Sequence, residues 1–112
     1  MDCLFCKIIN GDIPSSKVYE DDKILAFKDI NPQAPVHVLI IPKKHIDSMD
    51  CINGENIDYV SHVFLKVPEI AKTLGLDNGY RLISNCGSDG CQSVKHLHFH
   101  ILGGKKLNES MA

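Results

Sequence analysis

Arginine, tryptophan and long apolar segments are scarce or missing in this chain of 112 residues. Arg81 is the only arginine and the formal net charge is −2, so the sequence lacks the basic stripe that follows a nucleic-acid backbone. No apolar run approaches the ~20 residues of a membrane span, and the first residues lack the basic-then-apolar order of a secretory signal. We therefore expect neither a nucleic-acid partner nor a membrane partner.

Cysteine is present in an odd number, and five thiols cannot all pair within one chain. In a reduced protein, cysteines more often serve metal binding, catalysis or plain packing than disulfide formation. The expected location is therefore the reducing cytoplasm.

The order of apolar segments and turn residues predicts an α+β fold. Helices are expected over residues 3–10 and 55–76, and strands over residues 17–21, 23–30, 37–42, 80–85 and 94–102. Pro68 lies inside the long helix and is expected to kink it. Short turns between consecutive strands predict a five-stranded antiparallel sheet with the long helix on one side. A length of 112 residues with 44% hydrophobic content suits a single domain over residues 1–112.

Three histidines alternate with apolar residues near the C-terminus, in the segment HLHFHIL at 96–102. Side chains alternate across a strand, so His96, His98 and His100 are expected on one face and the residues between them on the core face. A row of imidazoles gains nothing as packing, because histidine is polar and ionises near neutral pH. The alternative is an exposed face that happens to be rich in histidine.

Two chemistries suit this histidine face. Alternating histidines can bind zinc together with a further ligand and an open water site, as in a zinc hydrolase. Alternatively, one neutral imidazole can act as a nucleophile while its neighbours orient it and bind the developing anion. The loop at 86–93 offers backbone N–H groups and hydroxyls that could stabilise charge on a phosphoryl group. That loop is not a Walker A motif, and a plain hairpin connection is its simpler interpretation.

Several separated segments together resemble the histidine-triad (HIT) family, and in particular its Hint branch. The histidine run matches the His-x-His-x-His signature of that family. The matching segments are CKII at 6–9, IP at 13–14, DINPQAPVH at 29–37, IPKKHI at 41–46, NCGSDGCQS at 85–93, HLHFHIL at 96–102 and GG at 103–104. The resemblance covers nearly the whole chain, with the motifs in the right order.

The resemblance implies a HIT-like fold that pairs into a homodimer, with a purine nucleoside monophosphate bound in each subunit. It also implies hydrolysis of nucleoside 5′-phosphoramidates at the α-phosphorus through a covalent nucleotidyl-histidine, with no cofactor required for the chemistry. His98 resembles the nucleophile, His100 and His37 the phosphate contacts, and Ser93 the donor to the bridging or leaving atom. The resemblance also marks a nucleotide-binding set, namely Asp29 for the ribose hydroxyls, Ile30 and Phe5 at the base, Asn85 at the phosphate end, Gln92 in the loop, and Leu4, Ile8, Phe27 and Leu39 along the pocket.

A structural zinc site is the second implication. Cys3 and Cys6 form a Cys-x-x-Cys pair, which supplies only two of the four ligands that a closed zinc site needs. Some bacterial members of the family complete such a site with two histidines, and the matching positions here are His45 and His96. Buried thiols and a solvated basic turn are the plain alternatives.

The sequence departs from the family pattern at two places. Cys91 stands where many relatives have a second glycine, and the tail after 103–104 is shorter than in Hint proteins, which bears on leaving-group preference. Three other functions remain open: a dinucleoside polyphosphate hydrolase or nucleotidyl transferase of the same superfamily, a zinc hydrolase whose metal ligands are His96, His98 and His100, or a non-catalytic nucleotide-binding module.

Overall fold

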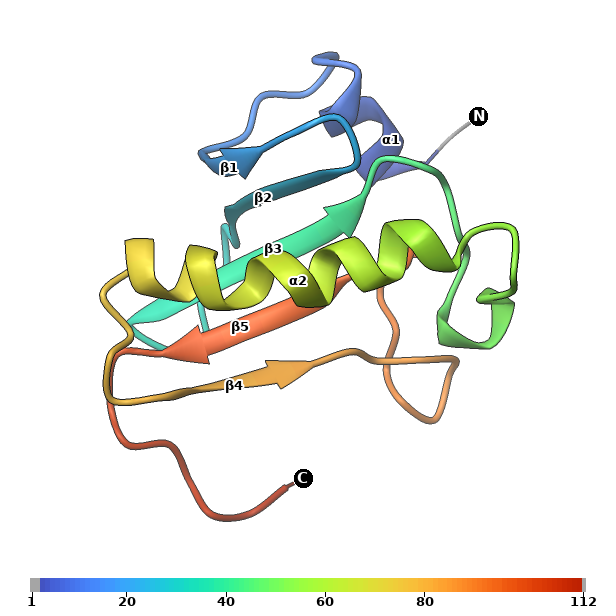
Figure 1. Cartoon of the computed structure of the whole chain (residues 1–112). Coiled ribbons are helices and arrows are strands. Elements are labelled where there is room, and N and C mark those ends of the chain that lie inside the picture. The colour runs from blue at the N-terminus through green and yellow to red at the C-terminus, as the bar shows by residue number, and fades with distance from the viewer. Residues whose placement is uncertain (1–2, 112) are drawn as a thin grey trace.

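The structure is a computed structural model that describes residues 3–111. Met1, Asp2 and Ala112, which the single-domain prediction includes, lie outside the described residues. In chain order the elements are α1 (Leu4–Ile9), β1 (Lys17–Glu20), β2 (Ile24–Lys28), β3 (Val36–Pro42), the short 3₁₀ helix η1 (Met49–Cys51), α2 (Ile57–Thr73), β4 (Tyr80–Ile83) and β5 (Phe99–Gly103). Figure 1 shows α2 lying across one face of the sheet and α1 on the side of β1 and β2.

The five strands form one antiparallel sheet in the order β1-β2-β3-β5-β4. The predicted α+β architecture, with one long helix and one short N-terminal helix, is therefore confirmed. β3 and β5 lie side by side at the centre, where Leu39 pairs with His100 and His37 pairs with Leu102. This pairing brings a histidine from the middle of the chain next to the C-terminal histidine run.

Each face of the sheet has its own core. One face packs against α2, because alternate residues of the neighbouring strands point toward it: Ile24, Ala26, Val38, Ile40, Phe99 and Ile101. Leu97, just before β5, joins the same core. The other face packs against α1 in a smaller cluster formed by Phe5, Ile8, Leu25, Phe27, Leu39 and Ile41. The predicted alternation of the histidine run thus holds, because the residues between the histidines join the α2 core.

The long helix α2 runs through Pro68 without a break. It is shorter at both ends than predicted, starting at Ile57 after the N-cap residue Asn56 and ending before Gly75, which has a φ of 76°. A positive φ is a common way for a helix to end, and glycine adopts it without steric cost.

The prediction for the last strand was wrong at its start. β5 begins at Phe99 and not at residue 94. In the observed register Leu97 would face Pro42, which has no N–H to donate to a sheet ladder. The backbone N–H of Leu97 instead donates to the carbonyl of Ile46 at 2.6 Å. Residues 94–98 therefore leave the sheet while still carrying His96 and His98 on the α1 side.

No helix within residues 3–111 has the length and apolar character needed to cross a membrane.

Candidate active site and metal centre

A hydrogen bond to the backbone determines which ring nitrogen of His98 is free. In His98, Nδ1 lies 2.7 Å from the carbonyl oxygen of His96, so Nδ1 carries the proton and donates it. Nε2 of His98 then presents its lone pair. A neutral imidazole held in this tautomer has the form that a nucleophile requires.

His37 and His100 form a hydrogen-bonded chain beside His98. The backbone N–H of Gln33 donates to Nδ1 of His37 at 2.9 Å, so His37 carries its proton on Nε2. That Nε2 donates to Nδ1 of His100 at 2.8 Å and lies 3.3 Å from an Asp29 carboxylate oxygen. His100 consequently carries its proton on Nε2, which is buried and has no hydrogen-bond partner. An unpaired N–H donor next to a nucleophile suits the oxygen of an anionic group.

Burial keeps these imidazoles neutral. It lowers the pKa of His100 to about 4, with the neighbouring His98 and His37 adding to the effect. Burial also lowers the pKa of His37, while the carboxylate of Asp29 opposes the shift. Near pH 7, His37 and His100 can therefore offer N–H donors without carrying a full positive charge.

A cavity of about 680 Å³ opens beside the histidines, over the α1 face of the sheet. Phe5 connects the two, since its ring meets that of His98 edge-on at 5.1 Å and that of Phe27 at 5.7 Å. Most residues expected around a nucleotide line this cavity: Leu4, Phe5, Ile8, Phe27, Asp29, Ile30, Leu39 and Ser93. Its mainly apolar wall and few polar groups are typical of a pocket for a small molecule.

Two expected nucleotide-binding residues do not line the cavity, and neither do the expected catalytic residues His37, His98 and His100. Asn85 follows β4 and is half-buried. The side chain of Gln92 bonds backbone groups of its own loop and of Asp47, so its amide faces away from the cavity. Ser93, directly after Gln92, is exposed and does line it.

The loop between β4 and β5 has a demanding backbone. At Gly90 a Cβ atom would lie 2.6 Å from the carbonyl oxygen of Cys86, so no side chain fits there. Cys91 has a φ of 59°, in the left-handed region that glycine adopts more readily. The glycine that many relatives have at this position can adopt the same backbone conformation without steric cost.

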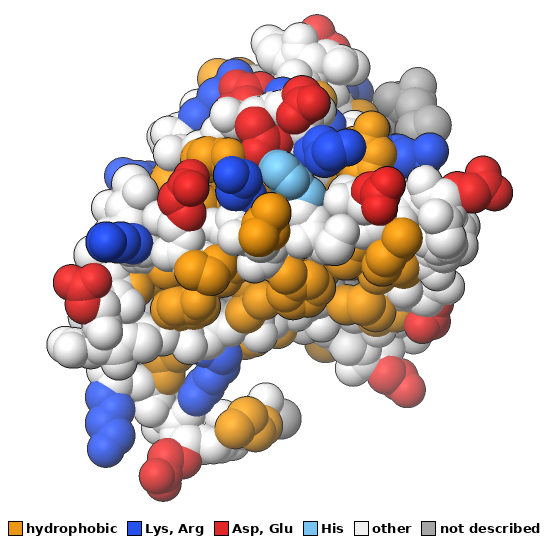
Figure 2. All heavy atoms as spheres, in the orientation of Figure 1, with side chains coloured by type: hydrophobic (Ala, Val, Ile, Leu, Met, Phe, Trp, Pro, Cys, Tyr) orange, Lys and Arg blue, Asp and Glu red, His pale blue; other side chains and the backbone are white. Residues whose placement is uncertain are grey.

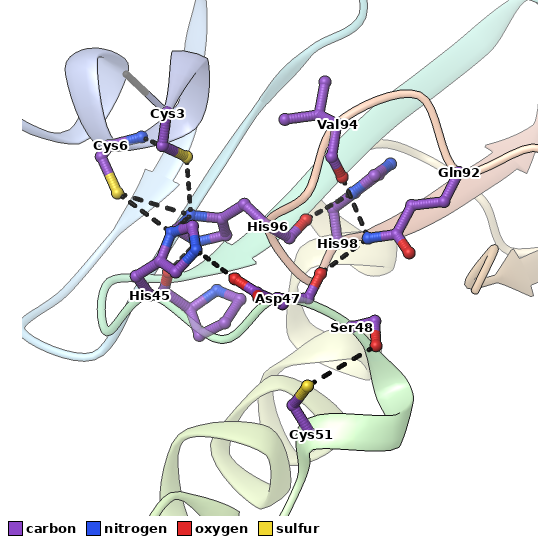
Figure 3. Close-up of polar contacts among 11 residues, drawn as sticks. Cys3, Cys6, His45, Asp47, Ser48, Cys51, Gln92, Val94, His96 and His98 are labelled. Atoms are coloured by element: carbon purple, nitrogen blue, oxygen red, sulfur yellow. Dashed lines mark hydrogen bonds and ion pairs between the residues drawn. The ribbon is translucent and has the colours of Figure 1, made fainter. Parts of the chain in front are cut away.

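The four predicted zinc ligands come together at the other end of the histidine run, as Figure 3 shows. Cys3 Sγ lies 3.3 Å from His96 Nδ1, Cys6 Sγ lies 3.3 Å from His45 Nδ1, and the two Nδ1 atoms are 3.2 Å apart. A tetrahedral zinc with bonds of about 2.0–2.3 Å places its ligand atoms about 3.3–3.8 Å apart. The donor set and its spacing therefore fit a closed zinc site.

The outer contacts of the two histidines support this fit. Nε2 of His96 donates to the carbonyl of Pro42 at 2.8 Å, and Nε2 of His45 contacts the Asp47 carboxylate at 2.6 Å. Both Nδ1 lone pairs then point at each other, an arrangement that a cation between them would stabilise. Burial raises the pKa of the Cys6 thiol to about 11, so a cation is also needed to hold it as a thiolate.

A second group of possible ligands differs from this cluster. Asp29, His37 and His100 also bring ligand atoms within 4.8 Å of one another. Here, however, a proton lies between the two imidazoles, because His37 donates to His100. The group satisfies itself by hydrogen bonding and does not require a metal.

Comparisons with known proteins show the family of this chain. The family model described as "Scavenger mRNA decapping enzyme C-term binding" matches residues 2–111. A 14 kDa zinc-binding protein of Brassica juncea is 47% identical over 109 residues, which cover 96% of each chain. A histidine triad protein structure from Clostridium difficile is 59% identical, with a TM-score of 0.94 over 98% of this chain and 96% of that one. The chain belongs to the histidine-triad family.

Two further HIT structures carry functional names. A HIT family hydrolase from Legionella pneumophila is 45% identical, with a TM-score of 0.95 over 99% of this chain and 100% of that one. A histidine triad nucleotide-binding protein from Candida albicans is 38% identical, with a TM-score of 0.82 over 99% and 87% of the two chains.

The sequence interpretation missed several site residues of this HIT protein. Ser15 and Ser16 also line the cavity, next to the Ile13-Pro14 motif, and Lys28 lines it between the predicted Phe27 and Asp29. Asp47 was missed as the partner of His45, and Ser84 as the donor to the carbonyl of His98 at 2.9 Å. The carboxylate two residues after a candidate histidine ligand was the available signal for Asp47.

Proposed function

We propose that this HIT protein hydrolyses purine nucleoside 5′-phosphoramidates through a nucleotidyl-histidine intermediate at His98. The observation that carries the proposal is the tautomer of His98, whose Nε2 lone pair is free because Nδ1 donates to the His96 carbonyl. The Nε2–H of His100 next to it is buried and unpaired, so it can donate to a phosphoryl oxygen.

The reaction would proceed in two displacements. Nε2 of His98 attacks the α-phosphorus and the P–N bond breaks. The leaving amine takes up a proton from solvent while the Ser93 hydroxyl donates a hydrogen bond to it. Water then attacks the phosphorus, the bond to His98 breaks, one proton of that water returns to solvent, and the nucleoside monophosphate leaves. Dividing the reaction in this way replaces one difficult step with two easier ones.

The cavity supports a purine nucleotide as the substrate class. Phe5, Phe27 and Ile8 form apolar walls for a base, and Asp29 lies between these walls and the histidines, where ribose hydroxyls would be. A carboxylate can accept hydrogen bonds from two neighbouring hydroxyls. The printed names of the Candida and Legionella proteins agree with nucleotide binding and with hydrolysis.

The cluster of Cys3, Cys6, His45 and His96 would hold a structural zinc. A closed set of four ligands leaves no position for water, so the metal would stabilise the fold and take no part in the chemistry. It would join the N-terminal helix to the start of the histidine run.

The deciding experiment measures AMP release from adenosine 5′-phosphoramidate in the presence of EDTA. We expect turnover by the wild type and a loss of at least about 10³-fold in His98→Asn. Asparagine can keep the donor to the His96 carbonyl, so the fold is retained while the nucleophilic nitrogen is lost. The His98→Ala variant should behave alike.

Other outcomes point to other functions. Activity that vanishes with EDTA and returns with zinc would indicate a zinc hydrolase. Nucleotide binding with no turnover above the His98→Ala level would indicate a binding module. Preferred cleavage of a dinucleoside polyphosphate would assign the chain to that branch of the superfamily.

We also propose a homodimer formed through the exposed face of α2. Figure 2 shows hydrophobic side chains gathered along α2, and Phe64 and Leu65 are 50% and 70% exposed. A contiguous apolar surface of this kind is typical of a subunit interface.

Sedimentation equilibrium tests the dimer. Phe64→Arg should shift wild-type dimer toward monomer, because a charge would be buried without a partner. Met49→Arg, which changes an exposed methionine outside α2, should leave the dimer intact. A wild-type monomer at high concentration would contradict the proposal.

A further inference from the structure

The side chain of Gln92 bonds backbone groups on both sides of Ser93. Its Oε1 accepts from the N–H of Gly87 at 3.0 Å, at the start of the loop. Its Nε2 donates to the carbonyl of Val94 at 3.0 Å, just after Ser93, and to the carbonyl of Asp47 at 2.7 Å. Both amide hydrogens and one acceptor position are therefore engaged with main-chain groups.

The contact with Asp47 extends this network to the cysteine–histidine cluster. The Asp47 carboxylate accepts from Nε2 of His45 at 2.6 Å, and Nδ1 of the same ring faces Cys6. Figure 3 shows this path from the cluster through His45 and Asp47 to Gln92. One hydrogen-bonded path thus joins the metal ligands to the loop that presents Ser93.

The loop needs such support because its backbone is strained and crowded. Cys91 lies in the left-handed region, and Gly90 packs against the backbone of Cys86. Ser93 itself is exposed at the cavity wall, and nothing on its solvent side holds it. Its position is set by the residues on either side of it.

We propose that Gln92 is a positioning residue: it holds the Ser93 hydroxyl at the phosphate end of the cavity and couples that hydroxyl to the cysteine–histidine cluster. The inference rests on the proposed function, in which Ser93 contacts the leaving atom. Gln92 therefore acts through Ser93 and through the loop, and does not contact the nucleotide directly.

Gln92→Glu isolates the donor side of this amide. The carboxylate keeps an acceptor for Gly87 but turns oxygen lone pairs toward the carbonyls of Asp47 and Val94, which repel them. Displacing a catalytic group by about 1 Å can cost about 10²-fold in rate. We expect kcat to fall by about that factor and KM to change by less than about threefold.

A double-mutant cycle separates positioning from a general loss of structure. The four proteins are the wild type, Gln92→Glu, Ser93→Ala and the double variant, assayed on adenosine 5′-phosphoramidate. If Gln92 acts through Ser93, adding Gln92→Glu to Ser93→Ala should cost less than about threefold. An equal loss in both backgrounds, or a rise in KM with kcat unchanged, would overturn the proposal. Asn78→Asp, an exposed amide-to-acid change before β4, is the matched control.

A binding measurement tests the coupling independently of turnover. Zinc affinity is measured by competition with a chelator, with and without saturating AMP. In the wild type AMP should tighten zinc binding several-fold, and in Gln92→Glu this effect should be lost, because coupling between two sites is reciprocal. No effect of AMP on zinc binding in the wild type would overturn the coupling. Coupling in a wild type without turnover would contradict the proposed hydrolysis and leave the role of Gln92 standing.

Discussion

His96 and His98 are two residues apart and both are buried, yet they belong to different kinds of site. Nε2 of His96 is held by the Pro42 carbonyl, which turns Nδ1 toward two thiols and a second imidazole. Nδ1 of His98 is held by the His96 carbonyl, which leaves the Nε2 lone pair free in a ring that packs edge-on against Phe5 of the cavity wall. The same residue type therefore serves a metal or a substrate according to which ring nitrogen the backbone occupies.

The largest effect should come from removing one ligand of the cysteine–histidine cluster. Cys6→Ala should lose zinc and lower the melting temperature by more than about 10 °C. A ligand bound at about 1,000 times its Kd stabilises the folded state by ~4 kcal/mol. In a small domain each kcal/mol of stability corresponds to several degrees of melting temperature. His98→Asn should abolish turnover while melting close to the wild type. Calorimetry and metal analysis on both proteins test this division.

Cys51→Ala is the control for that experiment, since Cys51 is an exposed cysteine outside the cluster. It should keep both zinc and thermal stability. The division of roles between the cysteine–histidine cluster and His98 is contradicted if Cys6→Ala melts like the wild type. It is also contradicted if Cys6→Ala loses activity while keeping zinc and stability.

A second prediction concerns the unpaired N–H donor of His100, next to His98. His100→Ala removes the unpaired Nε2–H donor, and we expect kcat to fall by about 10²- to 10³-fold, as for loss of one donor to a developing anion. His100→Gln places an amide N–H at a similar reach and should recover part of the loss. Steady-state kinetics on the phosphoramidate measure both values. Equal activity in the alanine and glutamine variants would show that donation from this position is unimportant.

The sequence predicted which residues meet, because period-two alternation and the family motifs fix them. It placed His96, His98 and His100 on one side of the chain, and it selected Asp29, Phe5 and Phe27 for the cavity that the structure contains. It could not predict the tautomers, since these depend on distant carbonyls such as that of Pro42, 54 residues from His96. It also could not show that the amide of Gln92 turns toward Asp47, which lies 45 residues away.

The start of β5 shows the same limit at the level of backbone structure. Alternation alone continues a strand back to residue 94, since His96 and Leu97 keep the pattern. The strand begins later because Pro42 of the neighbouring strand offers no N–H opposite Leu97. Strand pairing depends on the partner's sequence, which a local pattern does not contain.

The smallest expected effect is the contribution of His100 to the pH dependence of the free energy of unfolding. The pKa of His100 is about 4 in the folded chain against an ordinary value of 6.5, so the unfolded chain binds more protons between these values. Stability from this residue is therefore present above pH 6.5 and is lost as pH falls toward 4. Between pH 7 and pH 5 the wild type should lose about 2 kcal/mol more than His100→Gln, which has no titrating group there. Urea unfolding of both proteins at each pH gives this difference directly, and because both share the cysteine–histidine cluster, the acid sensitivity of that cluster cancels. Parallel losses in the two proteins would mean that His100 titrates alike folded and unfolded, and that burial does not keep its imidazole neutral.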